Sequence, residues 1–464
     1  MDASGVFAPA EWAERQFGAV ELGDVRRRRR AVVLAGQMAR HPAASLPDQA
    51  GGWSATKAGY RLFDRAEVTF EALQSPHWQM TRQAAGACGV VLMIEDTTEL
   101  DFTPHRKAAG LGPVGDGGGC GLLLHSTLAV DPEGAGRVLG LAYQMVFCRR
   151  ATPEHETRTQ RKQRRRESQI WPQSVEQVGA CVSGAQWVHV CDRYADNFEM
   201  FAACRREQVD FLIRVAQDRR VAPGHQAAEP SEHLLQWARS LPAAGRRELA
   251  VRSRPQRQAR RTRLSVAFAP LTVFPPWLDR DSSTPLRCWV VRVWEASPPA
   301  EEEPIEWVLL TSVPVEEFER ALTMSHWYSL RWLVEEYHKC LKTGCAVEKR
   351  QLQHADRLEA CIGMLALVAV RLLQLKLRAK ADPDCPALEA GSADHVRVLA
   401  AYRRRSAENW TVHEFWREVA KLGGFLARKS DGDPGWQTLW RGWQKLDLMT
   451  LGASLTQTED LNCG

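Results

Sequence analysis

Charged and aromatic residues recur at helical spacing in the stretch YSLRWLVEEYHKCLKTGC, which starts at Tyr328. On a helical wheel of about 100° per residue, the apolar side chains of this stretch share one face. The opposite side carries a narrow stripe of five residues: Tyr328, Arg331, Glu335, Lys339 and Lys342. The adjacent Glu336 lies off this stripe. Periodicity leaves two interpretations open, a solvated face, which is the commoner case, or the wall of a ligand site. The composition favours a metal-binding carboxylate flanked by phosphate-binding groups.

Two further carboxylates follow apolar runs that are typical of strands. The run VVLMIED finishes with Glu95 and Asp96, and WVHVCDR places Asp192 after a β-branched segment. An ionised carboxylate beside a sheet core is costly unless it meets a cation. Ligands of α/β sheets gather at the carboxyl ends of strands, where we expect both aspartates. Each aspartate taken alone is a weak signal, since an aspartate at such a place is more often part of a turn or a helix cap.

The segments between these residues indicate which elements must position them. Short runs rich in β-branched residues predict strands at 90–94, 122–130, 138–147, 187–191 and 211–215. Three strands in a row, followed by strand–helix alternation, predict an α/β fold class with a mixed sheet and helices on its faces. Alternating runs such as RLSVAFA and RCWVVRVW then predict a β-rich insertion in that domain.

Helices are predicted at both ends of the chain. Asp24 is a candidate N-cap for a helix through RRRRRAVVLAGQMAR. Near the end, DPGWQTLWRGWQKLDLM places four large apolar residues on one stripe of a helix: Trp436, Trp440, Trp443 and Leu446. Such a stripe serves either an intramolecular core or contact with a second copy of the chain.

The positive charge of the chain is local. The 464 residues are 44% hydrophobic and 25% charged, with a net charge of +5, which is typical of a globular protein of two or three domains. Residues 149–166 hold eight basic and two acidic residues, and 246–263 hold eight and one. Five consecutive arginines, 26–30, point all round a helix. These blocks indicate either a surface for a polyanion such as nucleic acid or merely solvated segments.

Several other classes of protein are disfavoured. None of the twelve cysteines forms a CxxC pair, so a structural zinc site is not expected. The most apolar helix, 360–370, is about half a membrane span, and no secretory signal begins the chain. We therefore expect reduced thiols, no membrane partner and a cytoplasmic location.

The stripe and the strand-end carboxylates together match a family signature. The pattern Y-x2-R-x3-E-x6-K is met by Tyr328, Arg331, Glu335 and Lys342, and it resembles the YREK signature of bacterial insertion-sequence DDE transposases. Other blocks resemble that family in the same order along nearly the whole chain: LGDVRRRRR, IEDTTELDF, VCDRYAD, PIEWVLLTSVPVE, RWLVEEYHKCLKTG, VAVRLLQL and WRGWQKL.

This resemblance implies a domain order. An RNase H-like catalytic domain would occupy 73–380, with the β-rich insertion at about 216–305. A helical domain at 1–72 would bind the transposon end, and a helical domain at 381–464 would dimerise. The glycine-rich segment at 112–121 offers no recognisable chemistry, and we expect a flexible loop near the active site.

The resemblance also implies the chemistry. Asp96, Asp192 and Glu335 would be the catalytic triad that binds two Mg²⁺ ions, for which Mn²⁺ could substitute. The family nicks the 3′ strand at a transposon end, forms and reopens a hairpin on the flanking strand, and joins the end to target DNA. The partners would be double-stranded terminal inverted repeats, target DNA and a second copy of the chain in a synaptic complex.

DNA contacts are assigned by the same resemblance. Tyr328, Arg331 and Lys342 would hold phosphates near a base extruded from the stack, on which Trp307 would stack. Core packing is otherwise the better interpretation for a tryptophan in an apolar strand. The remaining candidates for DNA contact are basic residues: Arg26, Arg27, Arg30, Arg214, Arg254, Arg257, Arg260, Arg261 and Lys339.

Two alternative functions remain open at this point. One is a metal-dependent DNA nuclease without strand transfer, and the other is a domesticated protein that binds transposon ends without moving them. The stripe of Tyr328, Arg331 and Lys342 and the terminal helices favour a transposase, because a simple nuclease needs neither hairpin handling nor the pairing of two ends.

Overall fold

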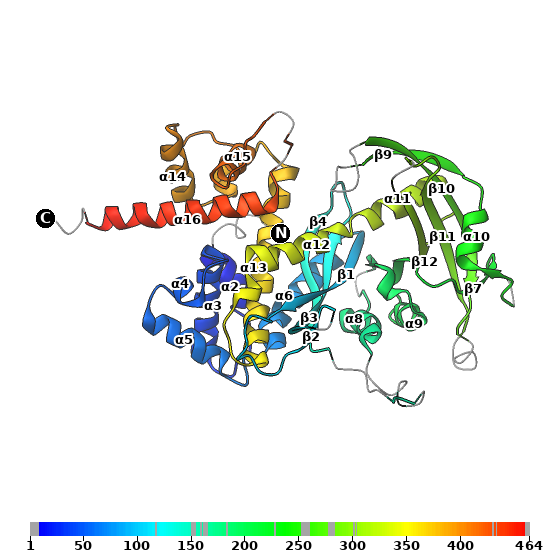
Figure 1. Ribbon diagram of the computed structural model, residues 1–464, viewed down its shortest axis with the longest axis horizontal. Helices are drawn as coiled ribbons and strands as arrows, with labels where there is room; N and C mark the ends of the chain where they lie inside the picture. The colour runs from blue at the N-terminus through cyan, green and yellow to red at the C-terminus, as the bar shows by residue number, and fades with distance from the viewer. Residues whose placement is uncertain are drawn as a thin grey trace.

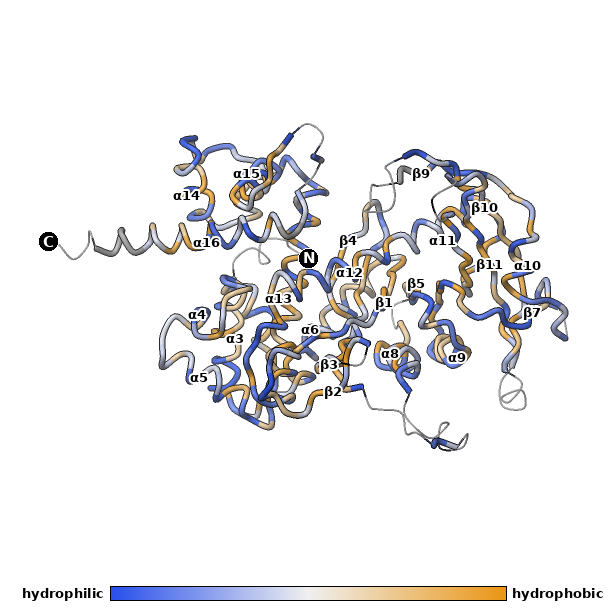
Figure 2. The backbone as a smooth tube through the Cα atoms, in the orientation of Figure 1, coloured by the Kyte–Doolittle hydropathy of each residue, from blue (hydrophilic) through white to orange (hydrophobic). Residues whose placement is uncertain are grey.

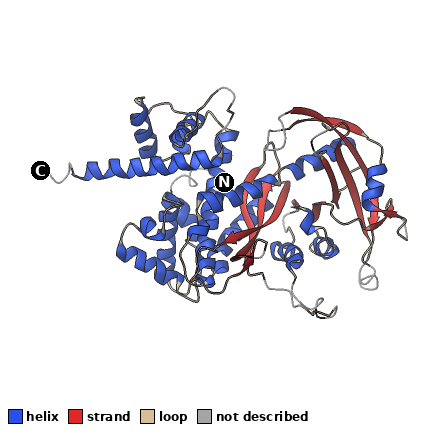
Figure 3. Cartoon of the chain, in the orientation of Figure 1, coloured by secondary structure: helices blue, strands red, loops and turns tan. Residues whose placement is uncertain are grey.

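The computed structural model describes residues 9–459 with short gaps (Figure 1). The residues within that range that it does not describe are 117, 150–154, 158–159, 161–165, 182–183, 227–228, 252–259, 277–283, 300–301, 303, 429–430 and 433. Helices dominate both ends of the chain, and the strands lie between them in sequence (Figure 3).

The N-terminal part is helical, as predicted. Its helices are α2 (Pro9–Phe17), α3 (Val25–Arg40), α4 (Leu46–Ala50), α5 (Trp53–Phe63) and α6 (Phe70–Gly86). Asp24 caps α3, since its carboxylate accepts a hydrogen bond from the Arg26 amide at 2.7 Å. Phe17 from α2 and Leu34 and Met38 from α3 are buried, so the apolar faces of these helices meet.

The strands of the described residues form one sheet. They are β1 (Val90–Asp101), β2 (Gly112–Val114), β3 (Gly119–Asp131), β4 (Arg137–Phe147), β5 (Gln186–Cys191), β6 (Asp210–Arg214), β7 (Arg220–Pro223), β8 (Glu232–His233), β9 (Gly245–Val251), β10 (Arg260–Val273), β11 (Leu286–Glu295) and β12 (Glu306–Thr311). The order is β2-β3-β1-β5-β6-β12-β11-β10-β7-β8, with β4 beside β3 and β9 beside β10. The pairs β1–β5 and β5–β6 are parallel and the other pairs are antiparallel, so the predicted mixed sheet is confirmed.

The predicted β-rich insertion extends this sheet rather than forming a separate one. Strand β11 pairs with β12 in an antiparallel register that sets Val293 opposite Trp307. The other side of β11 pairs with β10, and β10 in turn pairs with β7 and β9. The insertion is therefore hydrogen-bonded, strand by strand, to the part of the sheet that carries the candidate site.

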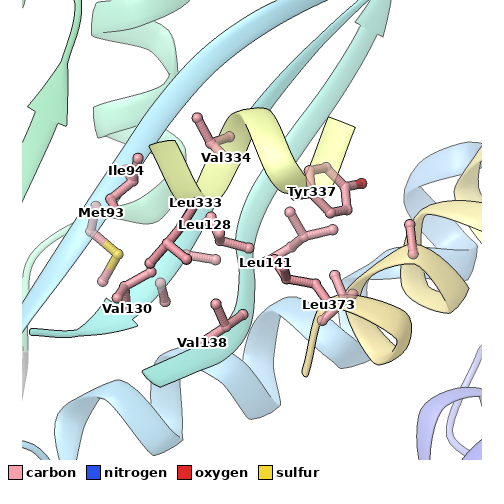
Figure 4. Packing of buried hydrophobic residues seen from close by; sticks show 14 of the residues in the cluster. Met93, Ile94, Leu128, Val130, Val138, Leu141, Leu333, Val334, Tyr337 and Leu373 are labelled. Carbon is pink, nitrogen blue, oxygen red and sulfur yellow. The ribbon is translucent and has the colours of Figure 1, made fainter. Parts of the chain in front are cut away.

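Helices cover the sheet. They are α8 (Ile170–Val178), α9 (Phe198–Arg206), α10 (Leu234–Ser240), α11 (Phe318–Ser329), α12 (Trp332–Lys339) and α13 (Ala355–Ala381). Figure 4 shows Leu333, Val334 and Tyr337 of α12 packed with Leu128 and Leu141 of the strands. This packing fixes the height and rotation of α12 above β1 and β3.

Helix α13 forms much of the core beneath the sheet. It is longer than the segment 360–370 expected from the sequence: Ala355–Arg378 is long and apolar enough to cross a membrane, but most of it is buried within the protein. Figure 2 shows this helix as a largely hydrophobic segment amid the other elements. Such burial is typical of the central helix of a packed domain.

The stretch that begins at Tyr328 is not one continuous helix, as the wheel assumed. Helix α11 ends at Ser329, α12 begins at Trp332, and a π-helical turn (Cys340–Gly344) follows. The turn is closed by a hydrogen bond of 2.8 Å from the Cys345 amide to the Cys340 carbonyl. Because a π-helical turn holds an extra residue, side chains beyond Lys339 rotate away from the positions that a regular wheel gives.

The expectation of a flexible loop at 112–121 was wrong. Strands β2 and β3 form a hairpin there, with Gly112 opposite Gly121. The glycines serve close backbone approach, since an added Cβ at Gly112 would come within 2.6 Å of the Arg149 carbonyl oxygen. An added Cβ at Gly119 would come within 2.7 Å of the Val114 carbonyl oxygen. Close backbone approach therefore explains the glycines at strand positions 112, 119 and 121, whereas Gly115 and Gly118 lie in the turn with open space around them.

The C-terminal helices are α14 (Ala393–Arg403), α15 (Val412–Leu422) and α16 (Trp436–Glu459). Trp440, Trp443 and Leu446 are buried, and the Trp443 ring stacks on Trp416 at 5.3 Å between centroids. These three residues of the stripe therefore serve the intramolecular core; the side chain of Trp436 lies outside the described residues. The far end of α16 projects from the body of the protein (Figure 1).

Candidate active site

Three carboxylates from distant segments lie near the end of the parallel pairing between β1 and β5, which are central strands of the sheet. The sequence predicted that Asp96 ends its strand, but β1 continues to Asp101 alongside β3. The parallel pairing of β1 with β5 does stop at Ile94, so Asp96 lies just beyond it. Asp192 follows the last residue of β5, and its carboxylate accepts a hydrogen bond from the Tyr194 amide at 2.8 Å. Glu335 lies in the first turn of α12.

Arg331 connects two of these carboxylates. Its Nη1 lies 3.3 Å from Oδ2 of Asp96, and its Nη2 donates to Oε1 of Glu335. Burial would lower the pKa of Arg331, but the charges of Asp96 and Glu335 outweigh burial and raise it. The guanidinium thus supplies positive charge to both carboxylates.

The electrostatics of the two aspartates favour binding of a cation. Burial raises the pKa of Asp96 to about 6, and the negative charges of Asp192 and Glu335 add to this rise, although Arg331 opposes it. Burial also raises the pKa of Asp192. Both carboxylates are therefore held in an environment where their ionised forms are unfavourable until more positive charge arrives.

The donor set fits a hard divalent cation, although the side chains are not arranged around one. Asp96, Asp192 and Glu335 offer carboxylate oxygens, which Mg²⁺ prefers. Among the residues that the structure describes, no group of three or more His, Cys, Asp or Glu side chains is placed to hold a metal ion. The guanidinium of Arg331 lies between Asp96 and Glu335, so metal binding requires its displacement.

A second cluster lies beside Asp192 and Arg331. The ring of Tyr328 lies 5.2 Å from that of Trp307 in an edge-to-face arrangement. Arg214 donates to the Glu306 carbonyl at 3.0 Å. Burial lowers the pKa of Arg214, and the nearby Tyr328 opposes this effect. The helical wheel set Tyr328 on a face opposite the apolar one, but it is only 6% exposed. Its ring belongs to the wall of the site.

The two lysines of the predicted stripe have other partners. Lys339 Nζ lies 2.8 Å from Glu336, which also pairs with Lys376 at 2.7 Å. Lys342, displaced by the π-helical turn, lies 3.5 Å from Glu348. The structure therefore brings Tyr328, Arg331 and Glu335 together and turns Lys339 toward Glu336.

The N-terminal arginines differ in their surroundings. Arg26 is exposed, and Arg30 is partly buried. Arg27 pairs with Glu67 at 2.6 Å and donates to the Leu22 carbonyl. Arg27 thus has a structural role within this helical part.

The insertion arginines differ as well. Arg261 is exposed on β10. Arg260 pairs with Glu295 at 2.9 Å and with Glu302, so its charge is already balanced by two carboxylates. Arg254 and Arg257 lie outside the described residues.

A buried polar group that was not predicted from the sequence is centred on Glu95, the residue before Asp96 on β1. Glu95 accepts hydrogen bonds from Nε2 of His125 on β3, at 3.1 Å, and from Nδ1 of His189 on β5, and all three side chains are inaccessible to solvent. Burial alone would raise the pKa of Glu95, but the two histidines lower it. The sequence contains an indication of this group, because each histidine interrupts an apolar strand run: His125 in LLLHSTLAV and His189 in WVHVC.

Three family models match the chain in order. "Transposase DNA-binding" matches residues 9–68, "Transposase DDE domain" matches 160–371, and "Transposase Tn5 dimerisation domain" matches 394–460. The DDE match includes Asp192 and Glu335 but begins after Asp96. DDE enzymes use divalent metal to cleave DNA and transfer strands, and the two flanking matches supply DNA binding and homodimer formation. With the mixed sheet and the carboxylates near the end of its β1–β5 pairing, these matches identify the protein as a DDE transposase of the Tn5 type.

Proposed function

We propose that this transposase moves an insertion sequence by a cut-and-paste pathway and belongs to the YREK subgroup. One observation carries the proposal: Arg331 bridges Asp96 and Glu335 and has Asp192 and Tyr328 within electrostatic range. Arg331 and Glu335 of the YREK pattern thus meet Asp96, which lies more than 200 positions earlier in the chain. The expected steps are a 3′ nick, hairpin formation, hairpin opening and strand transfer.

Asp96, Asp192 and Glu335 are the proposed ligands for two Mg²⁺ ions, with Mn²⁺ as a substitute. When bound, such ions activate the attacking water or 3′-hydroxyl and stabilise the leaving oxygen. The chain itself contributes orientation and charge. Arg331 and Arg214 provide guanidinium groups for phosphate oxygens, and the partly buried setting of the carboxylates strengthens every charge interaction there.

We also propose the domain limits 1–72, 73–380 and 381–464, terminal inverted repeats as the DNA that the helical N-terminal part recognises, and a cytoplasmic location. Two protomers would hold two ends in one synaptic complex. Exposed Arg26 and Arg261 are better candidates for DNA backbone contact than Arg27 and Arg260, whose charges are balanced by glutamates.

The central experiment supplies the purified protein with Mg²⁺ and the DNA that brackets its gene. Inverted repeats in that DNA should be nicked at the 3′ strand, then released through a hairpin, then joined to a target plasmid. Release of the flank by direct double-strand cuts, with no hairpin on a denaturing gel, would contradict the proposed pathway while leaving the enzyme a DDE transposase.

Trp307→Ala is expected to permit the first nick but to reduce hairpin yield by roughly 10- to 100-fold, because base stacking on an aromatic ring contributes about 1–3 kcal/mol. Trp307→Phe should retain most of the yield. Trp289→Ala serves as the control, since Trp289 lies in the same sheet but packs on His225. Denaturing gels separate nicked from hairpin products. An unchanged hairpin yield in Trp307→Ala would leave this residue with a packing role only.

The metal requirement should depend on pH. The pKa of Asp96, about 6, lies above its ordinary value of 3.8, so ionisation of Asp96 disfavours the fold, and the fold gains stability as pH falls through 6. Because protons compete with metal for Asp96, the Mg²⁺ concentration for half-maximal nicking should rise about tenfold per pH unit below 6. Mg²⁺ titrations at pH 5, 6 and 7.5 measure this, and a half-saturation independent of pH would remove Asp96 from the ligand set.

A further inference from the structure

A cavity of about 300 Å³ adjoins Asp96 on the side of β1 away from Trp307. The cavity is lined from β1, β3, β4, α8 and the turn after β5 that carries Tyr194. In the strand order β3-β1-β5-β6-β12, Trp307 lies farther along, on β12. Its volume is at the small end of ligand pockets, so it can take one planar group rather than several. A strand whose phosphate lies at the carboxylates would pass between the cavity and Trp307.

The cavity has aromatic walls. Trp171 on α8 is buried and packs edge-on against His125 at 4.7 Å between centroids, which fixes its position. Tyr194 lies at the rim, two residues after Asp192, and is 80% exposed. Because the Tyr194 amide donates to Asp192, the backbone at this ring is tied to one of the candidate metal ligands. An exposed ring at such a place is ready to stack on a flat partner.

The charges of the cavity select the kind of partner. Among the lining residues that the structure describes, Arg149 is the one basic residue, and it pairs with Glu99 at 2.8 Å and Glu167 at 2.7 Å. Asp96 adds a third carboxylate to the same walls. Over the described lining residues, three carboxylates and one guanidinium disfavour a phosphate group but not a neutral base, whose edge can hydrogen-bond to carboxylate oxygens and guanidinium nitrogens.

We propose that this cavity and the Tyr194 ring form a second base-binding site, which takes one nucleobase from the strand on the opposite side of the reacting phosphate from Trp307. This inference rests on the proposed function, because it requires a DNA strand across Asp96 and Asp192. The base comes from the flanking DNA before the end is cut or from target DNA during joining. Both sources present the same chemistry to the cavity.

Site-specific fluorescence tests this assignment on the full-length protein. Transposon-end duplexes carry 2-aminopurine at one flanking position at a time, with Ca²⁺ in place of Mg²⁺ to limit turnover. Wild type and Tyr194→Phe are expected to give the same fluorescence change at one position within a few nucleotides of the cut, and Tyr194→Ala should lose it. The control is Trp289→Ala, because Trp289 lies in the same sheet but packs on His225 and does not line the cavity.

Binding measurements complete the test. Tyr194→Ala should bind flanked ends roughly 5- to 100-fold more weakly than wild type and pre-cut ends equally well if the base comes from the flank. If the base comes from the target, the loss instead appears for target DNA bound to pre-cut ends. Equal binding in both arms, with the fluorescence unchanged by Tyr194→Ala, would overturn the inference. A wild-type protein that cuts and joins ends while giving that result would leave the proposed function intact.

Discussion

Asp96→Ala, Asp192→Ala and Glu335→Ala are each expected to reduce metal-dependent nicking of terminal-repeat DNA by at least about 1,000-fold, because each removes a candidate ligand from the centre where charge develops. DNA binding should persist, since the helical N-terminal part does not depend on these side chains. Nicking assays and gel shifts on the same preparations measure the two effects separately.

Glu336→Gln provides a matched control for Glu335→Ala. Glu336 is the next residue on α12, but its carboxylate pairs with Lys339 and Lys376, away from Asp96. Nicking by Glu336→Gln should remain within a few-fold of wild type. If the Glu335 variant cuts as well as this control, Glu335 is not a metal ligand, and the assignment of the helix to the active site fails.

Glu95→Ala is expected to destabilise the catalytic part by about 3–5 kcal/mol, because it leaves two buried histidines without their shared partner. Since the histidines lower the pKa of Glu95 below its ordinary value of 4.5, this stabilisation is present above pH 4.5 and is lost as the pH falls further. Urea unfolding of wild type and variant at pH 7 and pH 4 should show a smaller difference at the lower pH.

Glu99→Ala is the control for this effect. Glu99 lies on the same strand, but its side chain is 38% exposed and pairs with Arg149, so its loss should cost no more than about 1 kcal/mol. A Glu95→Ala variant as stable as Glu99→Ala would mean that the hydrogen bonds of Glu95 with His125 and His189 contribute nothing to the stability of the fold.

The sequence predicted the strands and the position of Glu335 beside Arg331, because both depend on residues that are close together in the chain. Continuous apolar runs rich in β-branched residues mark β1, β3, β5 and β6, which are largely buried on both faces. A wheel distinguishes Glu335 from Glu336 because only one turn separates Glu335 from Arg331.

Other features depend on tertiary structure and were not predictable. The π-helical turn at Cys340–Gly344 appears only once α12 is packed, and it redirects Lys342 toward Glu348. The hairpin at 112–121 depends on how closely neighbouring backbones approach, which composition does not encode. The cavity beside Asp96 joins residues from several strands and helices, so no short motif describes it.

The antiparallel pairing of β11 with β12 has a thermodynamic consequence for binding. Because Val293 lies opposite Trp307, the arginine-bearing strands of the insertion and the strand of the candidate stacking residue move as one body. The conformational entropy of aligning them is lost when the protein folds, not when DNA arrives. Mutations that loosen this strand pair should therefore weaken affinity for DNA even where they touch no nucleotide.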